Sequence, residues 1–207
     1  MYTGIRIKNI SPREFQGEKC SWNIAKNGPL ALVKGDIVVK DFKILAAAAM
    51  LGGGLRIVSS FFSYDGSEIL NLFYIIIDLC FVLALAGVFA FLRERLNALG
   101  RVGLLLTLCG IALIAGPEAT LYEVGIYQIG SPVIGVGTVM FSVNLLQNGL
   151  LGRIVPLSFL LSFAFGLLSM LMSVTVLFSI AGIAFGIGFI ALGWQLWKGA
   201  NTLQADL

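Results

Sequence analysis

Two charged residues of opposite sign, Arg56 and Asp78, lie inside apolar stretches of the sequence. Arg56 precedes Ser63 by seven residues, and Asp78 follows Glu68 by ten. If both stretches cross a membrane as helices, these offsets place the charges ~10 Å and ~15 Å from the same end. A lone charge at such depth costs at least ~3 kcal/mol, so each should face the bundle interior and find a partner. We therefore expect Arg56 and Asp78 to form an ion pair.

Polar neighbours at helical spacing extend this pair into a candidate site. The residues that share a helix face with one of the two charges are Gly52, Ser59, Asn71 and Tyr74. The charges could form a substrate or proton pathway, because ionisable residues inside membranes often mark such sites. Alternatively, a buried ion pair could fix the register of the first two helices, with Asn71 and Tyr74 completing its hydrogen bonds.

The composition of the chain is typical of a protein embedded in a bilayer. Of its 207 residues, 58% are hydrophobic and only 12% are charged, and the mean hydropathy is +0.94. A soluble domain of this size could not cover its core with so little polar surface. We therefore expect an integral protein of the cell membrane, that is, an inner or plasma membrane, with the lipid bilayer as its first partner.

The apolar runs predict an all-α fold, a bundle of six transmembrane helices within residues 42–198. A helix needs about 20 apolar residues to cross ~30 Å of hydrocarbon. The uncharged run 154–197 is long enough for two crossings, so a turn is expected near residues 169–175. Residues 1–41 should form a polar, cationic arm, in which 36–39 could be a short strand, and 199–207 a short tail. The expected crossings are approximately 43–62, 69–92, 101–116, 125–147, 154–171 and 174–197.

The distribution of charge predicts how these crossings are oriented. With six crossings, all of the 14 Lys and Arg residues except Arg56 fall on one side of the membrane. The loops on the other side carry only acidic residues. By the positive-inside rule, both the N-terminus and the C-terminus should be cytoplasmic. Trp194 and Trp197, beside Lys198, fit an aromatic anchor at the cytoplasmic interface.

Small residues recur at helical spacing and should hold the helices together. Glycine lets backbones approach closely in lipid, where no hydrophobic force drives helices together. The glycines expected to serve in packing are Gly52, Gly135, Gly166, Gly182 and Gly186. Two alternatives remain open. Residues 52–54 could form an unwound hinge beside Arg56, and the polar seam from Gln128 to Ser142 could line a water-filled pore.

The missing residue types exclude most enzymatic chemistry. Histidine is absent, which removes the commonest general base and the usual zinc and haem ligand. The sequence contains no HExxH, GxSxG, Walker or Rossmann pattern and no CxxC among its three cysteines. We therefore expect no enzyme, no cofactor, no metal site and no nucleic-acid partner.

Two functions remain. The preferred one is a protein that acts through contacts with lipids, with other membrane proteins or with itself. The alternative is a small carrier or proton-coupled permease in which Asp78 titrates and Arg56 is its partner.

Overall fold

The structure, a computed structural model, is a bundle of helices. It describes the backbone of residues 28–62, 67–114, 120–121 and 124–205, and the side chains of 41–62, 67–114 and 129–201. The helices are α1 (Gly28–Ser59), α2 (Glu68–Leu92), α3 (Ala98–Ile114), α4 (Ile126–Asn148), α5 (Ile154–Met172) and α6 (Thr175–Ala205). The two-residue strands β1 (Thr120–Leu121) and β2 (Val124–Gly125) pair antiparallel before α4. The predicted helical membrane fold is confirmed.

The described helices include five that are long and apolar enough to cross a membrane. These five spans are Asp41–Ser59, Glu68–Leu92, Ile129–Asn148, Ile154–Met172 and Thr175–Asn201. The helix α3 is apolar but has only 17 residues, which corresponds to ~26 Å. The count of six crossings therefore stays a prediction that depends on α3.

Several predicted boundaries agree with the structure, and others move. The turn expected near residues 169–175 is confirmed, because α5 ends at Met172 and α6 begins at Thr175. The helix α1 begins at Gly28, well before the predicted crossing, so residues 36–39 are helical and form no strand. The helix α6 likewise continues to Ala205, through most of the predicted tail. The remainder of the predicted arm, residues 1–27, lies outside the described residues.

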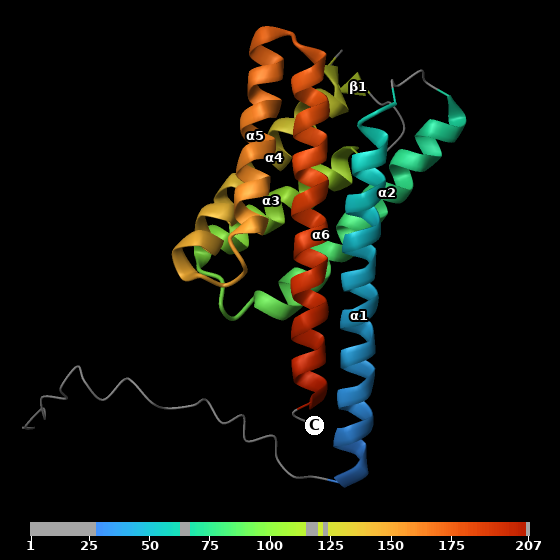
Figure 1. The fold of residues 1–207 in the computed structure, drawn as a ribbon, viewed down its shortest axis with the longest axis vertical. Helices are drawn as coiled ribbons and strands as arrows, with labels where there is room; N and C mark the ends of the chain where they lie inside the picture. The colour runs from blue at the N-terminus through green and yellow to red at the C-terminus, as the bar shows by residue number, and fades with distance from the viewer. Residues whose placement is uncertain (1–27, 63–66, 115–119, 122–123, 206–207) are drawn as a thin grey trace, which may run out of the picture.

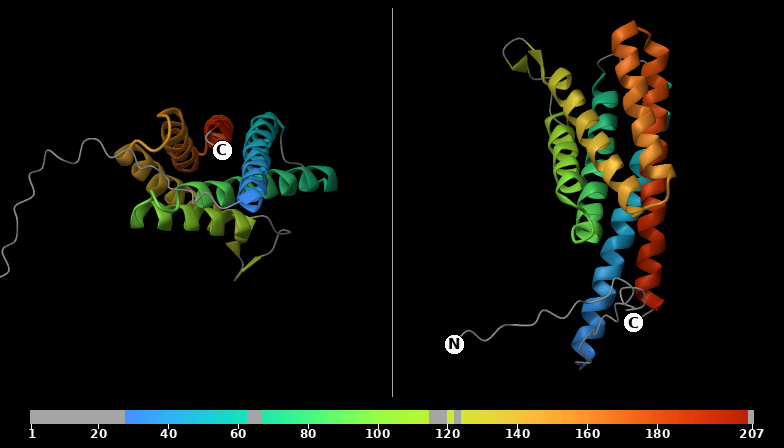
Figure 2. Two further views of the ribbon diagram at one scale, coloured as in Figure 1. Left: turned by 90° about the horizontal axis from the view of Figure 1, so that it is seen from below. Right: turned by 90° about the vertical axis from the view of Figure 1, so that its left-hand side faces the viewer.

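The longest helices, α1 and α6, pack side by side in opposite directions and extend beyond the other four at one end (Figure 1). On its other side α6 packs against α5, so that α1, α6 and α5 form one layer (Figure 2). The helices α3 and α4 form a second tight pair, which contacts α5 through α4. The helix α2 contacts α1, α3 and α6 and thereby joins the layer to the pair.

Phenylalanine rings fill the place where α2, α5 and α6 meet. Phe81 of α2 stacks on Phe189 of α6, with ring centroids 4.0 Å apart. Phe159 of α5 contacts the rings of Phe185 and Phe189 at 5.5 and 5.3 Å. Phe81, Phe159 and Phe189 are almost completely buried. We call these four residues the phenylalanine cluster, and it forms the centre of the bundle.

Glycines bring the backbones of α3 and α4 into direct contact. A Cβ atom added at Gly103 would lie 2.8 Å from the carbonyl oxygen of Gly137, and one added at Gly137 would lie 2.7 Å from the carbonyl oxygen of Gly103. About two turns further along, Gly110 and Gly130 are related in the same way, at 3.1 Å in both directions. No larger residue fits at such distances, so these glycines fix how closely α3 and α4 approach.

Candidate functional site

The position of Arg56 follows from the faces that α1 presents to its neighbours. A Cβ atom at Gly52 would lie 2.7 Å from a side chain of α2, whereas one at Gly53 would lie 2.5 Å from a backbone oxygen of α6. Successive residues of an α-helix are rotated by about 100°, so Arg56 falls between these two directions. Its guanidinium lies beside Gly182 of α6, where an added Cβ would be 3.5 Å from Nη2. Arg56 therefore lies on the side of α1 that faces both α2 and α6.

Two hydroxyl groups bind the backbone next to this side chain. Ser59 and Ser60 each donate a hydrogen bond to the carbonyl oxygen of Arg56, at 2.8 and 2.9 Å. Ser59, a predicted site residue, is buried. Its hydroxyl proton is therefore used within α1, and only its oxygen lone pairs could take part in further chemistry.

The structure does not show the predicted ion pair between Arg56 and Asp78. Both side chains are half-buried, and no charged side chain is buried among the described residues. Within 4.0 Å, the described residues contain one ion pair, between Arg93 and Glu94 at 3.9 Å. The rotation of α1 explains the difference, because packing of Gly53 on α6 turns Arg56 partly away from α2.

The other two predicted site residues differ in depth. Tyr74 is half-buried, and its ring meets that of Phe73 edge-on at 6.4 Å. It packs against the hydrophobic core of the bundle. Asn71 is exposed near the start of α2. The structure thus places Arg56, Ser59, Tyr74 and Asp78 at partly or fully buried positions, whereas Asn71 is exposed.

The predicted packing glycines differ in how closely they are approached. Gly186 interlocks with Gly53, because a Cβ atom on either would lie 2.5 Å from the carbonyl oxygen of the other. A Cβ atom added at Gly135 would lie 2.7 Å from the ring of Phe163, and one added at Gly182 would collide with the hydroxyl of Ser60. Gly52 is packed against α2, as described above. By contrast, Gly166 has only an ordinary contact, at 3.9 Å.

The two alternatives for these regions receive no support. The helix α1 continues through residues 52–54, so the glycine triplet is not unwound. Along α4, Gly135 of the predicted pore seam packs against the ring of Phe163, and Thr138 and Ser142 are buried, so this part of the seam faces no open channel. The side chain of Gln128, at the start of that seam, lies outside the described residues.

Two buried polar residues were not selected from the sequence as site residues. Ser142 and Asn144 of α4 are fully buried, and their side-chain polar atoms have no hydrogen-bond partner among the described residues. Asn144 lies directly against Gly100 of α3, which has no side chain to displace it. The contact between Asn144 and Gly100 can be recognised only once α3 and α4 are placed side by side, because the sequence does not show which residue lies opposite Asn144.

Two shallow crevices among the described residues lie away from Arg56 and Asp78. One, of about 230 Å³, is lined by Leu106, Pro132, Val133 and Val136. The other, of about 220 Å³, is lined by Asp41, Phe42, Leu45 and Ala90. Both are apolar crevices between neighbouring helices.

The described side chains thus form a helical membrane bundle with two half-buried charges of opposite sign. They contain no group of three His, Cys, Asp or Glu residues that could hold a metal ion. No protein-family model matches the chain, and no curated protein or solved structure matches it.

Proposed function

We propose that this chain is a non-enzymatic multi-pass membrane protein that acts through contacts with lipids, with other membrane proteins or with further copies of itself. The observation that carries the proposal is the filled centre of the bundle. A carrier or an intramembrane enzyme needs an internal space in which a substrate meets polar groups. Here the phenylalanine cluster occupies the centre, and interlocked glycines close the α1–α6 contact.

The phenylalanine cluster also bears on the candidate charges. Phe81 lies one helical turn beyond Asp78 on α2, towards the end of the helix that carries Arg93. Its ring is stacked on Phe189 and meets Phe185 edge-on at 5.4 Å. These stacked rings fill the space between α2, α5 and α6 at that level. This arrangement favours a contact function over transport.

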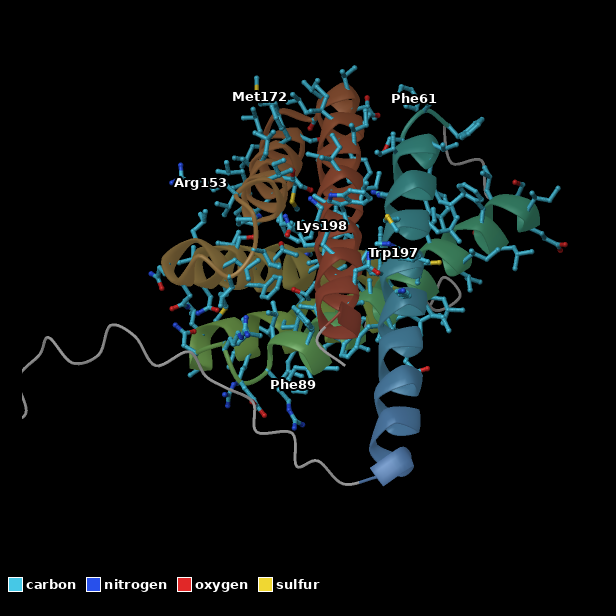
Figure 3. The ribbon with its side chains drawn as sticks, turned by 60° about the horizontal axis from the view of Figure 1, so that its bottom comes forward. Phe61, Phe89, Arg153, Met172, Trp197 and Lys198 are labelled. Carbon is cyan, nitrogen blue, oxygen red and sulfur yellow. The ribbon has the colours of Figure 1, made fainter. Side chains whose placement is uncertain are left out.

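Exposed apolar residues supply surfaces for such contacts. The end of the α5–α6 hairpin carries Met170, Leu171 and Met172, which are 77%, 74% and 59% exposed. Phe61, just after α1, is 75% exposed. Figure 3 shows that Met172 and Phe61 both point outward from the upper end of the bundle. Lipid or an apolar protein surface would cover these side chains.

A second candidate, a small carrier or proton-coupled permease, is favoured by one observation. Arg56 and Asp78 are both half-buried, and they form no ion pair with each other within 4.0 Å. Because neither charge is tied to the other, each retains hydrogen-bonding capacity for a proton or an ionic solute. In this candidate Asp78 is the titrating group and Arg56 is its partner.

Variants of the two charges distinguish these functions. Arg56→Ala, Asp78→Asn and the double variant are compared for thermal stability in detergent and for solute and proton uptake in liposomes. For a contact protein, we expect no flux in any variant and a stability change in the singles that the double variant partly restores. Flux in the wild type that disappears in folded single variants would establish the carrier instead.

Purification in mild detergent provides an independent test. A contact protein should retain a partner at fixed stoichiometry, either a lipid class, another membrane protein or a second copy. The Gly54→Ala chain is a suitable control, because nothing lies within 4 Å of a Cβ atom at that position. Its partner content should equal that of the wild type. Recovery of the chain without any such partner, together with measurable flux, would exclude the contact function.

For the orientation, we propose that both termini lie in the cytoplasm and that the membrane is the cell membrane. Consecutive helices of the bundle run in alternating directions, so the cations beside the helix ends gather at one end of the molecule. They are Lys43, Arg93, Arg95, Arg101, Arg153 and Lys198. Lys43 and Lys198 lie over the rings of Trp197 and Trp194, at 5.9 and 5.2 Å. This combination of cations and tryptophans is typical of the cytoplasmic interface.

A further inference from the structure

The connection between α2 and α3 is anchored in the core and presents charge to the outside. Leu92 and Leu96 are 1% and 2% exposed and hold the two ends of this turn against the bundle. Arg93, Glu94 and Arg95, which lie between them, are all exposed. Backbone hydrogen bonds from Arg95 and Leu96 to the Leu92 carbonyl oxygen, at 2.8 and 3.0 Å, close the turn. The arginines therefore project from an ordered turn.

A third arginine is held beside the same turn. Arg101, in the first turns of α3, donates from Nε to the carbonyl oxygen of Leu96 at 3.1 Å. Asn97 caps α3 by accepting a hydrogen bond from the backbone N–H of Gly100 at 2.9 Å. These bonds fix both the helix start and the Arg101 side chain, while the terminal Nη groups of its exposed guanidinium carry further donors. We call Arg93, Arg95 and Arg101 the arginine cluster.

One acidic residue lies within the cluster and does not neutralise it. Glu94 is 3.9 Å from Arg93, but the two side chains are 73% and 64% exposed. Solvated pairs of this kind are weak and are screened by salt. The segment from 93 to 101 therefore presents three guanidinium groups against one carboxylate.

Apolar surface begins directly beside the arginine cluster. Leu99, Val102 and Leu105 of α3 are exposed, at 36%, 47% and 49%. On α2, Phe89 is exposed one turn before Arg93. In a bilayer these side chains face acyl chains, which places the three guanidinium groups at the depth of the lipid headgroups.

We propose that the arginine cluster binds the phosphate-bearing headgroups of anionic phospholipids, whose acyl chains lie along the exposed face of α3. The inference rests on the proposed contact function and names its lipid partner. Guanidinium groups form two-pronged, charge-assisted hydrogen bonds with phosphate oxygens. An anionic leaflet adds about 1 kcal/mol of attraction for each nearby Lys or Arg. The ordered turn lowers the entropic cost of binding, because Arg101 is already held.

A lipid titration tests this proposal. The full chain in nonionic detergent is titrated with fluorescent phosphatidylglycerol, with unlabelled phosphatidylglycerol, phosphatidylcholine or inorganic phosphate as competitor. We expect unlabelled phosphatidylglycerol to compete and the other two to compete much less. Each arginine replaced by glutamine should weaken apparent affinity about fivefold. Equal competition by inorganic phosphate would mean a phosphate site rather than a lipid site and would overturn the proposal.

Matched variants separate the arginine cluster from general positive charge. Arg153→Gln and Lys198→Gln remove exposed cations at the same end but outside the cluster, and should leave lipid affinity unchanged. If a triple variant that combines Arg93→Gln, Arg95→Gln and Arg101→Gln does not fold, Arg95→Gln alone keeps the test possible, because the exposed side chain of Arg95 makes no hydrogen bond within the described residues. An equal loss of affinity in Arg153→Gln and Arg95→Gln would refute the cluster.

The lipid inference and the contact function fail in different ways. A chain that binds no phosphatidylglycerol but purifies with a stoichiometric protein partner would refute the arginine cluster and leave the contact function intact. Flux that depends on Asp78, with no retained partner of any kind, would refute both.

Discussion

At the residue scale, two adjacent glycines of α1 have opposite surroundings. A Cβ atom on Gly53 would lie 2.5 Å from the carbonyl oxygen of Gly186 and 2.9 Å from the backbone nitrogen of Ile190. A Cβ atom on Gly54 would meet nothing within 4 Å. Backbone atoms of a packed helix cannot move aside as a side chain can, so Gly53 is the position that fixes the distance between α1 and α6.

This contrast gives the first prediction. Gly53→Ala should destabilise the protein by about 1–3 kcal/mol, because the added methyl group overpacks a contact between backbones. Gly54→Ala should be neutral or stabilising by up to ~1 kcal/mol, because alanine has the higher helix propensity. Thermal unfolding in detergent measures both. Equal effects of the two substitutions would show that α1 and α6 are not in contact at Gly53.

Buried hydroxyl groups give the second prediction. Within the part of the chain that the structure describes, the Oγ atom of Ser142 is buried without a hydrogen-bond partner, whereas that of Ser169 donates to the carbonyl oxygen of Val174 at 3.0 Å. Ser142→Ala should stabilise the chain by about 1 kcal/mol, since it removes an unsatisfied polar group. Ser169→Ala should cost about 1 kcal/mol, since it removes a bond. The same unfolding assay applies, and destabilisation by Ser142→Ala would mean that this hydroxyl has a partner.

The spacing of residues in the sequence predicted part of the candidate site but not all of it. Helical periodicity grouped Arg56 with Gly52 and Ser59, and those residues do lie on neighbouring sides of α1. The rotation of α1 could not be derived in this way, because it depends on the contact between Gly53 and Gly186, which lie about 130 residues apart in the sequence. For this reason the sequence predicted a direct contact with Asp78 that the structure does not show.

At the scale of elements, the α5–α6 turn is the connection that the sequence located best. An uncharged run long enough for two crossings must reverse near its middle, and it does so between Met172 and Thr175. Ser173 accomplishes the reversal with φ 54° and ψ 34°, in the left-handed region. A residue with a Cβ atom is disfavoured there by roughly 1–2 kcal/mol.

The third prediction concerns this turn. Ser173→Gly should raise stability by about 1 kcal/mol, because glycine adopts the left-handed conformation without steric cost. Ser173→Ala keeps the Cβ atom and serves as the control, with little expected change. Thermal unfolding of the two variants side by side measures the difference. A larger gain from alanine than from glycine would contradict the left-handed conformation.

The ends of α1 and α6 were predicted less well, for a physical reason. Hydropathy identifies the part of a helix that lies in lipid, and it assigned 43–62 and 174–197. Beyond those limits the two helices continue beside each other, and Ala200 is still buried. Packing against neighbouring helices, which hydropathy does not detect, stabilises this end of α6. Phe91 of α2, for example, would lie 2.7 Å from a Cβ atom at Gly199.

At the scale of the whole molecule, the number of crossings depends on α3. Its 17 residues include Arg101 near the start, so its apolar part is shorter than that of the other spans. Its interlocked contact with α4 nevertheless aligns it with a helix that is long enough to cross. We expect α3 to cross, because separating α3 from α4 would expose the tight contact of Gly103 with Gly137.

Cysteine labelling tests this expectation as the fourth prediction. Single cysteines replace Arg95, Arg153 or Ser173 in a chain without its native cysteines, and a membrane-impermeant maleimide is applied to intact and lysed cells. With six crossings, positions 95 and 153 should react only after lysis, and position 173 in intact cells. If α3 does not cross, positions 95 and 153 would lie on opposite sides.

The interlocked contact between Gly53 and Gly186 joins α1 to α6, which affects how the protein is made. At a translation rate of about 5–20 residues per second, the ribosome produces Gly186 on the order of ten seconds after Gly53. For that interval, the side of α1 that carries Gly53 lacks its partner helix, while α2 can already pack against Gly52. The contact between α1 and α6 can form only after α6 has been made, so a chain released before α6 would be a target for membrane quality control.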